Sequence, residues 1–368
     1  MIVKKFRAEN FRNIEKCEIS FSPGINLLHG KNAQGKTNAL EGIYIFSRGK
    51  SFRTQDEREL VKSGCEGFNL FLEYEDKTGK GNLEYSVFGR ERQRKKNGYK
   101  IKRLTEMIGS FKTVLFSPDD LTVVKGGPEQ RRAFLNVAIS QCYTSYIDLY
   151  SCYKKALENR SCLLKSIKNG MYVDKGELYS WSETVAEYAS HIYLFRKEYI
   201  KILEAHATEL QKLISDGREI MSLSYKSGIP EELTSSEDIK NEYIRLLSTN
   251  TERECAAGVT LYGPHRDDME INVNGSLARA FASQGQQRSL VLSMKLAEGE
   301  VNREICGEYP VYLLDDVLSE LDEKRQKFVI NGIKEKQVII TSCESDGILK
   351  FADAVTEVVG GNYVSSYR

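Results

Sequence analysis

An eight-residue phosphate-loop signature near the N-terminus constrains this chain more than any other feature of its sequence. Residues 30–37 read GKNAQGKT and match the pattern G-x-x-x-x-G-K-[ST]. They follow a short apolar run, Gly24–His29, and precede a stretch with helical spacing, Asn38–Phe46. In a strand–loop–helix context, the loop N–H groups and the helix N-terminus can hold phosphates. The signature therefore predicts an α/β domain that binds a nucleoside triphosphate; a glycine-rich turn without a ligand is the simpler alternative.

Two residues of the loop have distinct expected roles. Lys36 is expected to contact the β- and γ-phosphates, and Thr37 is expected to ligate Mg²⁺. The glycines permit the tight turn whose backbone N–H groups point at the phosphates. The predicted nucleotide-binding residues are Gly30, Lys31, Asn32, Ala33, Gln34, Gly35, Lys36 and Thr37.

A phosphate loop needs an acidic partner for the metal, and a second segment supplies one. The apolar strand Val311–Leu314 is followed directly by Asp315 and Asp316. A buried parallel strand delivers side chains to its C-terminal edge, where ligands of α/β sheets bind. We assign Asp315 to Mg²⁺, directly or through water, and Asp316 to orienting or deprotonating the attacking water. The alternative is a strand that simply stops at polar residues. The predicted catalytic residues are therefore Lys36, Asp315 and Asp316.

A third motif, Ser283-Gln284-Gly285-Gln286, opens a predicted helix that runs from about Gln287 to Ile305. A serine with glycine and glutamine at a helix N-terminus can form a second anion site. We therefore include Ser283, Gly285 and Gln286 among the candidate phosphate ligands. Read in isolation, the same string is a helix cap and nothing more.

The middle of the chain has helical periodicity, whereas both ends alternate between strand and turn patterns. From Glu129 onward, apolar residues recur at steps of three and four, at Leu135, Ile139, Cys142, Tyr146, Leu149, Tyr153 and Leu157. A second run extends from Leu178 to Leu213 beyond the turn pair Asn169-Gly170. Two such runs predict an antiparallel helical hairpin. We therefore predict one α/β domain assembled from residues 1–127 and 258–368, with a helical arm, residues 128–257, inserted into it.

The segments after the arm again have strand character. Met269–Val273 and Leu277–Ala282 flank the turn pair Asn274-Gly275, which predicts two strands of a hairpin. A helix near Glu323–Lys334 and a strand at Val338–Thr341 complete the expected αβ alternation.

Residues 89–103 are densely basic and contain a second hairpin signal. Eight cations accompany a single acid, Glu91, and Asn97-Gly98 is a strong turn pair. Because successive side chains of a strand point to opposite faces, a hairpin would place several of these cations on each face, where they could contact a phosphate backbone. The candidate DNA contacts are Arg92, Arg94, Lys95, Lys96, Lys100 and Lys102. The alternative is a solvated edge strand that its charges protect from aggregation.

The overall charge restricts where such a site can be. The chain has 53 Lys and Arg against 52 Asp and Glu, a formal net charge of +1. That balance excludes a uniformly basic nucleic-acid coat and an acidic disordered tail, so a DNA site must be a local patch. No apolar run approaches the ~18 residues of a membrane span. The N-terminal MIVKKFR has no apolar signal core. We therefore expect a cytoplasmic protein without a membrane partner.

Together these motifs resemble a known family. The order of the motifs resembles that of the ATP-binding-cassette (ABC) ATPases of the SMC type. That order is the phosphate loop, the helical insert, S-x-G-Q, the apolar strand with Asp-Asp, and then Ser319-Glu320-Leu321-Asp322. Further strings are similar to the RecF family of bacterial recombination and repair proteins: FSPDDL at 116–121, KGGP at 125–128, Arg131-Arg132, Phe134-Leu135, GPHRDD at 263–268 and 315–322. The resemblance covers essentially the whole chain.

The resemblance implies a fold, an activity and partners. It implies an ABC-type P-loop ATPase head with an inserted helical arm, and a weak, DNA-stimulated ATPase that acts as a conformational switch. ATP would lie between two copies of the chain, with Ser283 of one reaching the γ-phosphate held by Lys36 of the other. This nucleoid-associated homodimer would close on double-stranded and gapped or single-stranded DNA, and would help RecO and RecR load RecA onto gaps.

Other arginines and two departures from transporter-type cassettes complete the comparison. Arg53 resembles an arginine that SMC-type ATPases place near nucleotide and DNA, although a surface salt bridge is an equal alternative. Arg131-Arg132 is either a second DNA contact or two charges near a helix start. Asp316 stands where transporters usually carry Glu, and Thr341-Ser342 where many cassettes carry His. Both departures resemble RecF and argue against fast turnover.

Three other functions fit parts of the pattern. A chromosome-organising SMC ATPase would need an arm of hundreds of residues, whereas this insert spans only 128–257. A transporter-type cassette subunit is disfavoured by the arm, the Asp-Asp ending and the basic hairpin. A DNA-binding scaffold with a vestigial nucleotide site would not bind ATP.

Overall fold

The chain separates into two compact units in a computed structural model, which describes residues 1–343 and 349–367. Unit 1 comprises Met1–Leu121, Glu209–Arg218 and Arg288–Arg368, and unit 2 comprises Thr122–Thr208 and Glu219–Gln287. This division differs from the predicted boundaries at 127/128 and 257/258. The segment after residue 258 joins unit 2 because strand β10, Asp268–Val273, pairs antiparallel with β9, Met221–Lys226.

Unit 1 contains a six-stranded sheet in the order β15-β14-β3-β13-β12-β8. Its strands are β3 (Ile25–His29), β8 (Thr113–Phe116), β12 (Val311–Asp315), β13 (Val338–Ser342), β14 (Ala354–Val359) and β15 (Asn362–Tyr367). All pairings are parallel except that of β14 with the edge strand β15. Strand β3 lies between β13 and β14, so the two ends of the chain build one sheet. The predicted α/β head assembled from both ends is confirmed.

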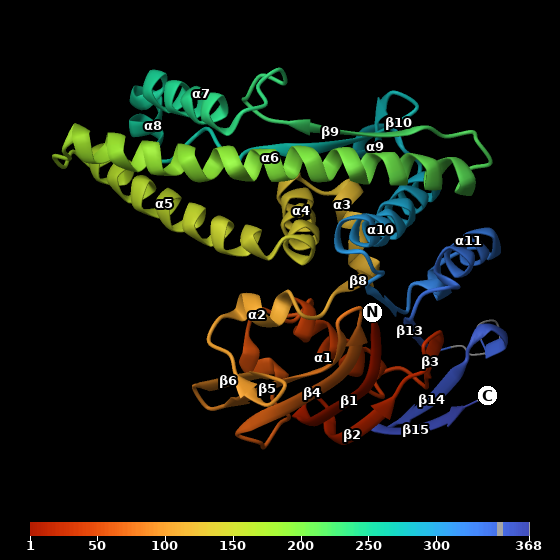
Figure 1. Cartoon of the computed structure of the whole chain (residues 1–368). Coiled ribbons are helices and arrows are strands. Elements are labelled where there is room, and N and C mark those ends of the chain that lie inside the picture. Colours follow the sequence, from red (N-terminus) through yellow and green to blue (C-terminus); the bar gives the residue numbers. More distant parts are fainter. Residues whose placement is uncertain (344–348, 368) are drawn as a thin grey trace. The chain divides into compact units, whose positions relative to one another are not determined.

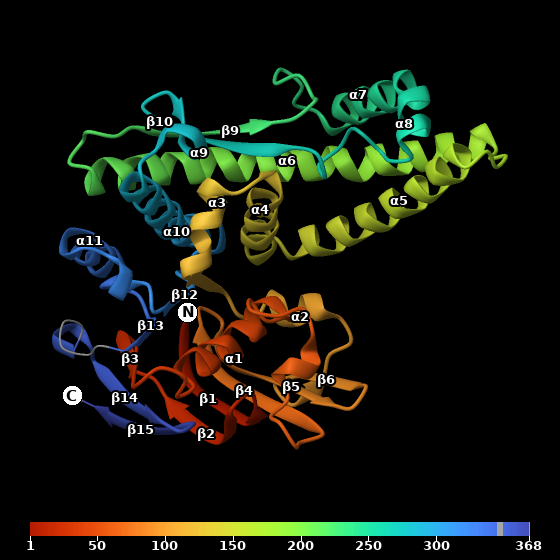
Figure 2. The ribbon, with the colours of Figure 1, turned by 180° about the vertical axis from the view of Figure 1, so that it is seen from behind.

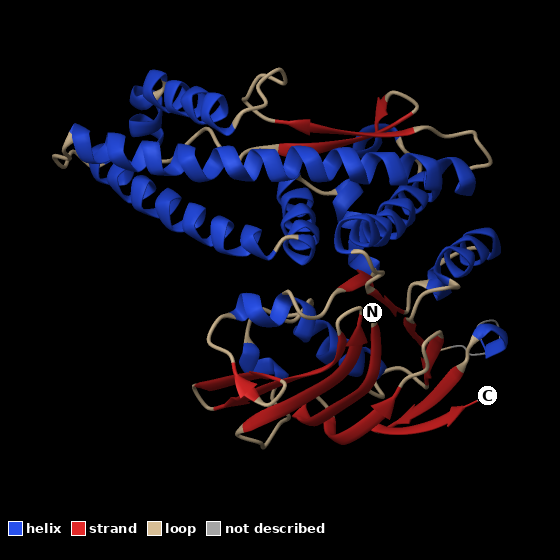
Figure 3. Cartoon of the chain, viewed as in Figure 1, coloured by secondary structure: helices blue, strands red, loops and turns tan. Residues whose placement is uncertain are grey.

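A second six-stranded sheet of unit 1 is antiparallel, in the order β2-β1-β4-β5-β6-β7. Its strands are β1 (Ile2–Phe11), β2 (Ile14–Ser20), β4 (Gly67–Asp76), β5 (Gly79–Phe88), β6 (Glu91–Lys96) and β7 (Tyr99–Lys100). Buried and partly exposed residues alternate along β4 and β5. This alternation gives the sheet one face for the core and one for solvent. Figure 3 shows the strands of both sheets in red.

Helix α1, Lys36–Arg48, lies between the two sheets of unit 1. Its buried Ile43 and Phe46 belong to one core with Phe6 of β1 and Leu313 of β12. A Cβ on Gly42 would lie 2.5 Å from the Phe6 ring, so the helix can approach β1 only with glycine there. The opposite face of the parallel sheet packs against α10 (Gln284–Cys306) and α11 (Glu323–Ile333). The phosphate loop is therefore anchored in the centre of unit 1.

Unit 2 is mainly helical and contains the predicted antiparallel hairpin (Figure 1 and, from behind, Figure 2). Its long helices are α5 (Thr144–Lys168) and α6 (Lys175–Ile214), of which residues 209–214 belong to unit 1. The other elements are α4 (Pro128–Cys142), α7 (Ser236–Thr249), α8 (Thr251–Ala257), α9 (Ala278–Phe281) and the sheet β11-β10-β9 with β11 at Ser276–Leu277.

Short helices connect these elements. They are α2 (Leu104–Ile108), α3 (Leu121–Lys125) and the 3₁₀ helices Glu57–Leu60, Pro118–Asp120, Leu318–Glu320 and Leu349–Phe351. Within the described part of the chain, no helix has the length and apolarity that crossing a membrane requires.

Two sequence-based expectations for unit 2 are wrong. The helical run expected from Glu129 to Leu157 is broken at Tyr143, whose φ of −128° and ψ of 99° are extended. One extended residue leaves the apolar spacing intact, so the pattern concealed the break. The strand expected at Leu277–Ala282 is mostly helix α9, since alanine and arginine after a turn favour helix over strand.

Buried charges hold unit 2 together. Arg131 is 3% exposed and donates to both Asp268 oxygens, at 2.7 and 2.8 Å. Arg196 is fully buried and donates to the Pro264 carbonyl at 2.6 Å. Burial also lowers the pKa of His265 to about 4, which keeps the ring neutral. The GPHRDD string is therefore part of a structural network, and Arg131 has no free surface for DNA.

Candidate nucleotide-binding site

The phosphate-loop signature forms a tight connection between β3 and α1. Gly30 and Gly35 have φ of 155° and 113°, a region that residues with a side chain rarely adopt. A Cβ on Gly30 would lie 2.3 Å from the Val358 carbonyl oxygen, so the close approach requires glycine. Helix α1 begins without a side-chain cap. Its first N–H groups are therefore suited to an anion.

Lys36 lies inside the curve of this loop. Its side chain is buried, and its ammonium donates to the carbonyls of Gly30 at 2.5 Å and Lys31 at 2.9 Å. The cation thus lies against carbonyl groups of the loop itself, and its contact with phosphate stays a prediction.

Two residues that are far apart in sequence meet beside the loop. The Thr37 hydroxyl donates to Oδ1 of Asp315 at 2.7 Å, and the Thr341 hydroxyl donates to the same oxygen at 2.8 Å. Thr37 is the second residue of α1 and Asp315 ends β12, so both lie at the carboxyl edge of the parallel sheet. A hydroxyl and a carboxylate are the oxygen ligands that Mg²⁺ prefers. The two residues predicted to hold the ion are therefore placed together, and their role stays a prediction.

Asp316 occupies an unusual turn directly after β12. Its φ is 53°, a left-handed conformation uncommon for residues other than glycine but tolerated by Asp and Asn. The Thr341 hydroxyl accepts from the Asp316 N–H at 3.0 Å, and the Ser319 hydroxyl donates to the Asp316 carbonyl at 2.7 Å. These contacts fix the turn and so fix where the carboxylate lies.

Cys343 is a site residue that sequence reasoning missed. Its thiol donates to Oδ1 of Asn32 at 2.6 Å, and its sulfur accepts from the Lys36 ammonium at 3.4 Å. Cys343 directly follows β13, which neighbours both β3 and β12 in the sheet. The rule that ligands bind at the carboxyl ends of parallel strands would have identified this position.

The C-terminal hairpin also holds the loop, in a way that the sequence did not reveal. In the turn between β14 and β15, Gly360 N–H donates to Oε1 of Gln34 at 2.6 Å, and Gly361 N–H to the Gln34 carbonyl at 3.0 Å. The Tyr363 hydroxyl donates to the Gly35 carbonyl at 2.8 Å. Burial raises the pKa of Tyr363, so the hydroxyl keeps its proton.

Replacing Tyr363 with phenylalanine should weaken ATP binding about 2- to 12-fold, because one hydrogen bond that fixes the loop is lost. The measurement is a titration with a fluorescent ATP analogue. Ser365→Ala is the matched control, since Ser365 lies on the same strand and bonds Thr356 rather than the loop. Equal affinity of the Tyr363→Phe variant and the wild type would contradict a role for the hairpin in shaping the loop.

Arg53 lies beside the start of α1. Its guanidinium donates to Oδ1 of Asn38 at 2.8 Å and to Oε2 of the buried Glu41 at 3.4 Å. Arg12 donates to the same carboxylate at 2.7 and 3.0 Å. The salt-bridge alternative for Arg53 is therefore realised, with a buried carboxylate as the partner.

The third motif, which belongs to unit 2, caps the N-terminus of α10, whose residues from Arg288 onward belong to unit 1. Ser283 is exposed; its hydroxyl accepts from Gln286 N–H at 3.3 Å, and its own N–H donates to Oε1 of Gln286 at 2.8 Å. This reciprocal pair is a capping box. The string therefore does cap the helix, as that alternative requires. The assignment of Ser283, Gly285 and Gln286 to phosphate stays a prediction.

The basic hairpin forms as predicted, but half of its candidate DNA contacts have partners within the chain. Arg92 donates to Glu57 at 2.5 Å, and Lys95 to Glu84 at 2.9 Å. Arg94 lies over the Tyr85 ring, 5.0 Å from its centre. The remaining candidates, Lys96, Lys100 and Lys102, have no ion pair among the residues that the structure describes.

Comparisons with known proteins agree with this geometry. The family model described as RecF/RecN/SMC N terminal domain matches residues 2–365. The DNA replication and repair protein RecF of Clostridioides difficile is 39% identical over 347 residues, which cover 94% of this chain and 92% of that relative. The corresponding protein of Staphylococcus carnosus is 38% identical, with 95% of each chain covered. A solved structure of the recombination mediator protein RecF-ATP in the RecFOR pathway superposes with a TM-score of 0.92 at 33% identity, covering 100% of this chain and 97% of that chain.

Proposed function

This chain belongs to the RecF family, and from that premise we propose that it is an ATP-dependent DNA-binding protein of recombinational gap repair. It forms an ATP-sandwiched homodimer on DNA and helps RecO and RecR load RecA onto single-stranded gaps. The observation that carries the proposal is the contact between Thr37 and Asp315, which joins the phosphate loop to the acidic end of β12. Relatives named DNA replication and repair protein RecF, at 38–39% identity, support the biological context.

The residues of the site have separate roles in this proposal. Lys36 and the loop N–H groups bind the β- and γ-phosphates of ATP. Thr37 and Asp315 hold Mg²⁺, which neutralises phosphate charge when bound. Asp316 orients the attacking water and accepts its proton at a carboxylate oxygen. Ser283 of a second copy completes the γ-phosphate contacts.

The surroundings of Asp316 support slow ATP hydrolysis, as a conformational switch requires. The Ser319 hydroxyl, which donates to the Asp316 carbonyl at 2.7 Å, also lies 3.1 Å from Oδ1 of Asp316, so its one proton is shared with an oxygen of the proposed base. The Asp316 side chain is also one methylene shorter than the glutamate of transporter cassettes. We therefore propose a weak ATPase that DNA stimulates, in which ATP closes the dimer and hydrolysis releases it.

The length of the arm supports this proposal over a chromosome-organising ATPase. Helices α5 and α6 have 25 and 40 residues, which at 1.5 Å per residue give about 40 and 60 Å. That is a short projection, without the long coiled coil of SMC proteins. The relatives at 38–39% identity also carry the RecF name rather than that of a transporter subunit.

Replacing Ser283 with arginine should abolish dimer formation in ATP. Light scattering after size exclusion should give the wild type a mass of 41.8 kDa alone and twice that value with ATP and Mg²⁺. The Ser283→Arg variant should bind ATP but remain at the monomer mass, because a bulky cation then fills the shared phosphate site.

Two controls make this result specific. Ser276→Arg changes another exposed serine of unit 2 and should leave the dimer intact. Lys36→Ala should remain monomeric because it fails to bind ATP. An ATP-dependent dimer that Ser283→Arg leaves unchanged would rule out the sandwich, and a wild type that binds no ATP would favour the vestigial scaffold.

A further inference from the structure

The turn that joins β6 to β7 places an aromatic ring among cations. Asn97 and Gly98 form the turn, with φ of 51° and 81°. Tyr99 pairs directly with Lys96 across it, so the two side chains share one face of the hairpin. The Tyr99 side chain is 79% exposed. Lys100, the next residue of β7, lies on the opposite face and pairs with Lys95. We name Lys96, Tyr99 and Lys100 the hairpin tip.

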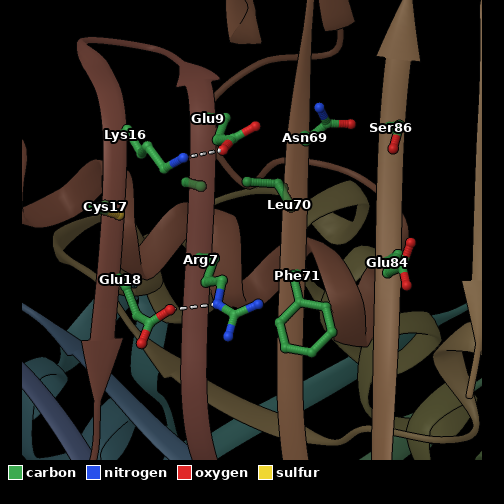
Figure 4. Close-up of a pocket in the computed structure, with 11 residues that line it drawn as sticks. Arg7, Glu9, Lys16, Cys17, Glu18, Asn69, Leu70, Phe71, Glu84 and Ser86 are labelled. Carbon is green, nitrogen blue, oxygen red and sulfur yellow. Dashed lines mark hydrogen bonds and ion pairs between the residues drawn. The ribbon is translucent and has the colours of Figure 1, made fainter.

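The cations of the hairpin tip lack the partners that neighbouring cations of the same sheet have. Figure 4 shows the solvent face of β2, β1, β4 and β5, where Arg7 contacts Glu18 at 2.5 Å and Lys16 contacts Glu9 at 3.0 Å. The charges of Arg7 and Lys16 are therefore balanced. Across the part of the chain that the structure describes, Lys96 and Lys100 form no ion pair.

The pairing of the strands adds repulsion to this imbalance. Lys100 pairs directly with Lys95, so two like charges face each other across the hairpin. Glu84 neutralises Lys95 and leaves Lys100 without compensation. Like charges at directly opposite positions destabilise a β-pair. A polyanion bound at the hairpin tip would relieve that cost, so the local charge favours a phosphate-bearing ligand.

Protection of an edge strand explains the lysines but not the tyrosine. Strand β7 is the edge of the sheet, and lysines at an edge discourage pairing with another sheet. An exposed aromatic ring beside them works against that purpose, because it offers apolar surface to a second edge. Aromatic rings next to cations are, in contrast, what proteins use to bind unpaired nucleotides, by stacking on a base while lysines hold phosphates.

We propose that the hairpin tip is a contact site for unpaired DNA bases, in which Tyr99 stacks on a base, Lys96 on the same face holds the adjoining phosphate, and Lys100 on the opposite face holds a phosphate farther along the strand. The inference rests on the proposed DNA binding and adds the element of DNA that is recognised. An intact duplex covers both faces of each internal base, whereas a gap leaves bases free to stack on a side chain. The hairpin tip therefore selects DNA with a single-stranded segment.

The decisive experiment compares Tyr99→Ala with Tyr99→Phe on two labelled DNAs of equal length, one gapped and one fully duplex. Fluorescence anisotropy with ATP and Mg²⁺ at one fixed salt concentration gives the affinities. Tyr99→Ala should weaken binding to gapped DNA about 5- to 150-fold, because stacking on one base is lost. Its affinity for the duplex should change less than about 2-fold. Tyr99→Phe keeps the ring and should match the wild type on both DNAs.

A salt titration tests the lysines separately. The double variant Lys96→Gln/Lys100→Gln should bind both DNAs more weakly, and the slope of log affinity against log salt should fall in magnitude by about 1–2. Lys16→Gln is the matched control, since this lysine lies on the same sheet but is paired with Glu9. It should leave affinity and slope unchanged.

The possible outcomes separate this inference from the proposed function. Unchanged binding of gapped DNA by Tyr99→Ala would overturn the stacking contact, and so would an equal loss on both DNAs. An unchanged salt slope in the double lysine variant would overturn the phosphate contacts. In each of these cases wild-type binding to DNA would leave the proposed function standing. A wild type that binds neither DNA with ATP would overturn both.

Discussion

Replacing Asp316 with asparagine should slow ATP hydrolysis about 10²- to 10⁴-fold while leaving ATP binding nearly unchanged. Asparagine has the same shape and tolerates the left-handed backbone at this position, where φ is 53°. It can still accept from the Ser319 hydroxyl, but it cannot take a proton from water. The variant should therefore hold ATP and stay dimeric for longer than the wild type. Phosphate release measures the rate, and light scattering measures the dimer.

Asp322→Asn is the control for this experiment. Asp322 caps α11 by accepting from Arg325 N–H at 2.9 Å, a role that asparagine also fills. Its hydrolysis rate should equal that of the wild type. If Asp316→Asn hydrolyses ATP as fast as Asp322→Asn, another group activates the water.

Replacing Glu254 with alanine should destabilise unit 2 by about 3–5 kcal/mol, because it leaves a buried guanidinium without a counter-ion. Glu254 and Arg160 are both fully buried, with 2.6 Å between Oε2 and Nη2. The second oxygen, Oε1, accepts from Leu261 N–H at 2.7 Å, so the variant also loses that bond. Urea unfolding followed by the fluorescence of Trp181 measures the effect, since the single tryptophan lies on α6 in the same unit.

Glu252→Ala provides the comparison. Glu252 lies on the same helix but is exposed, so its removal should change stability by less than about 0.5 kcal/mol. A Glu254→Ala transition that coincides with that of Glu252→Ala would show that Arg160 finds another partner or reaches water.

The parts of the fold that the sequence predicted are those with strong local signals. Short apolar runs bounded by turns identified β3, β12 and β13, because strands buried on both faces lack polar residues. The phosphate loop and Asp315 could be assigned to one site because parallel strands share a carboxyl edge. The break at Tyr143 could not be foreseen, since the apolar spacing continues through it.

The parts of the site that were missed depend on tertiary contacts. The Gly360-Gly361 pair between alternating segments indicates a hairpin. Nothing local indicates that this hairpin would contact Gln34, more than three hundred residues earlier. Pairing of Arg92 with an acid was equally invisible, because Glu57 lies on a different element. The acid that binds Lys95, Glu84, lies directly across from it on the adjacent strand. Local sequence motifs thus predicted the kind of ligand, a nucleotide or DNA. Contacts between distant segments determine which side chains remain available to bind it.

The order in which strands of the parallel sheet are synthesised has a consequence for the newly made chain. Ile25 of β3 pairs with Val338 of β13, and at roughly 5–20 residues per second a ribosome needs on the order of 15–60 s to produce the intervening stretch. Unit 2 can mature in that interval, because most of its segments are already complete. In unit 1, in contrast, the apolar strand β3 has no partner on either edge until β13 and β14 have been made. We therefore expect chaperone demand during translation to fall mainly on residues 1–121.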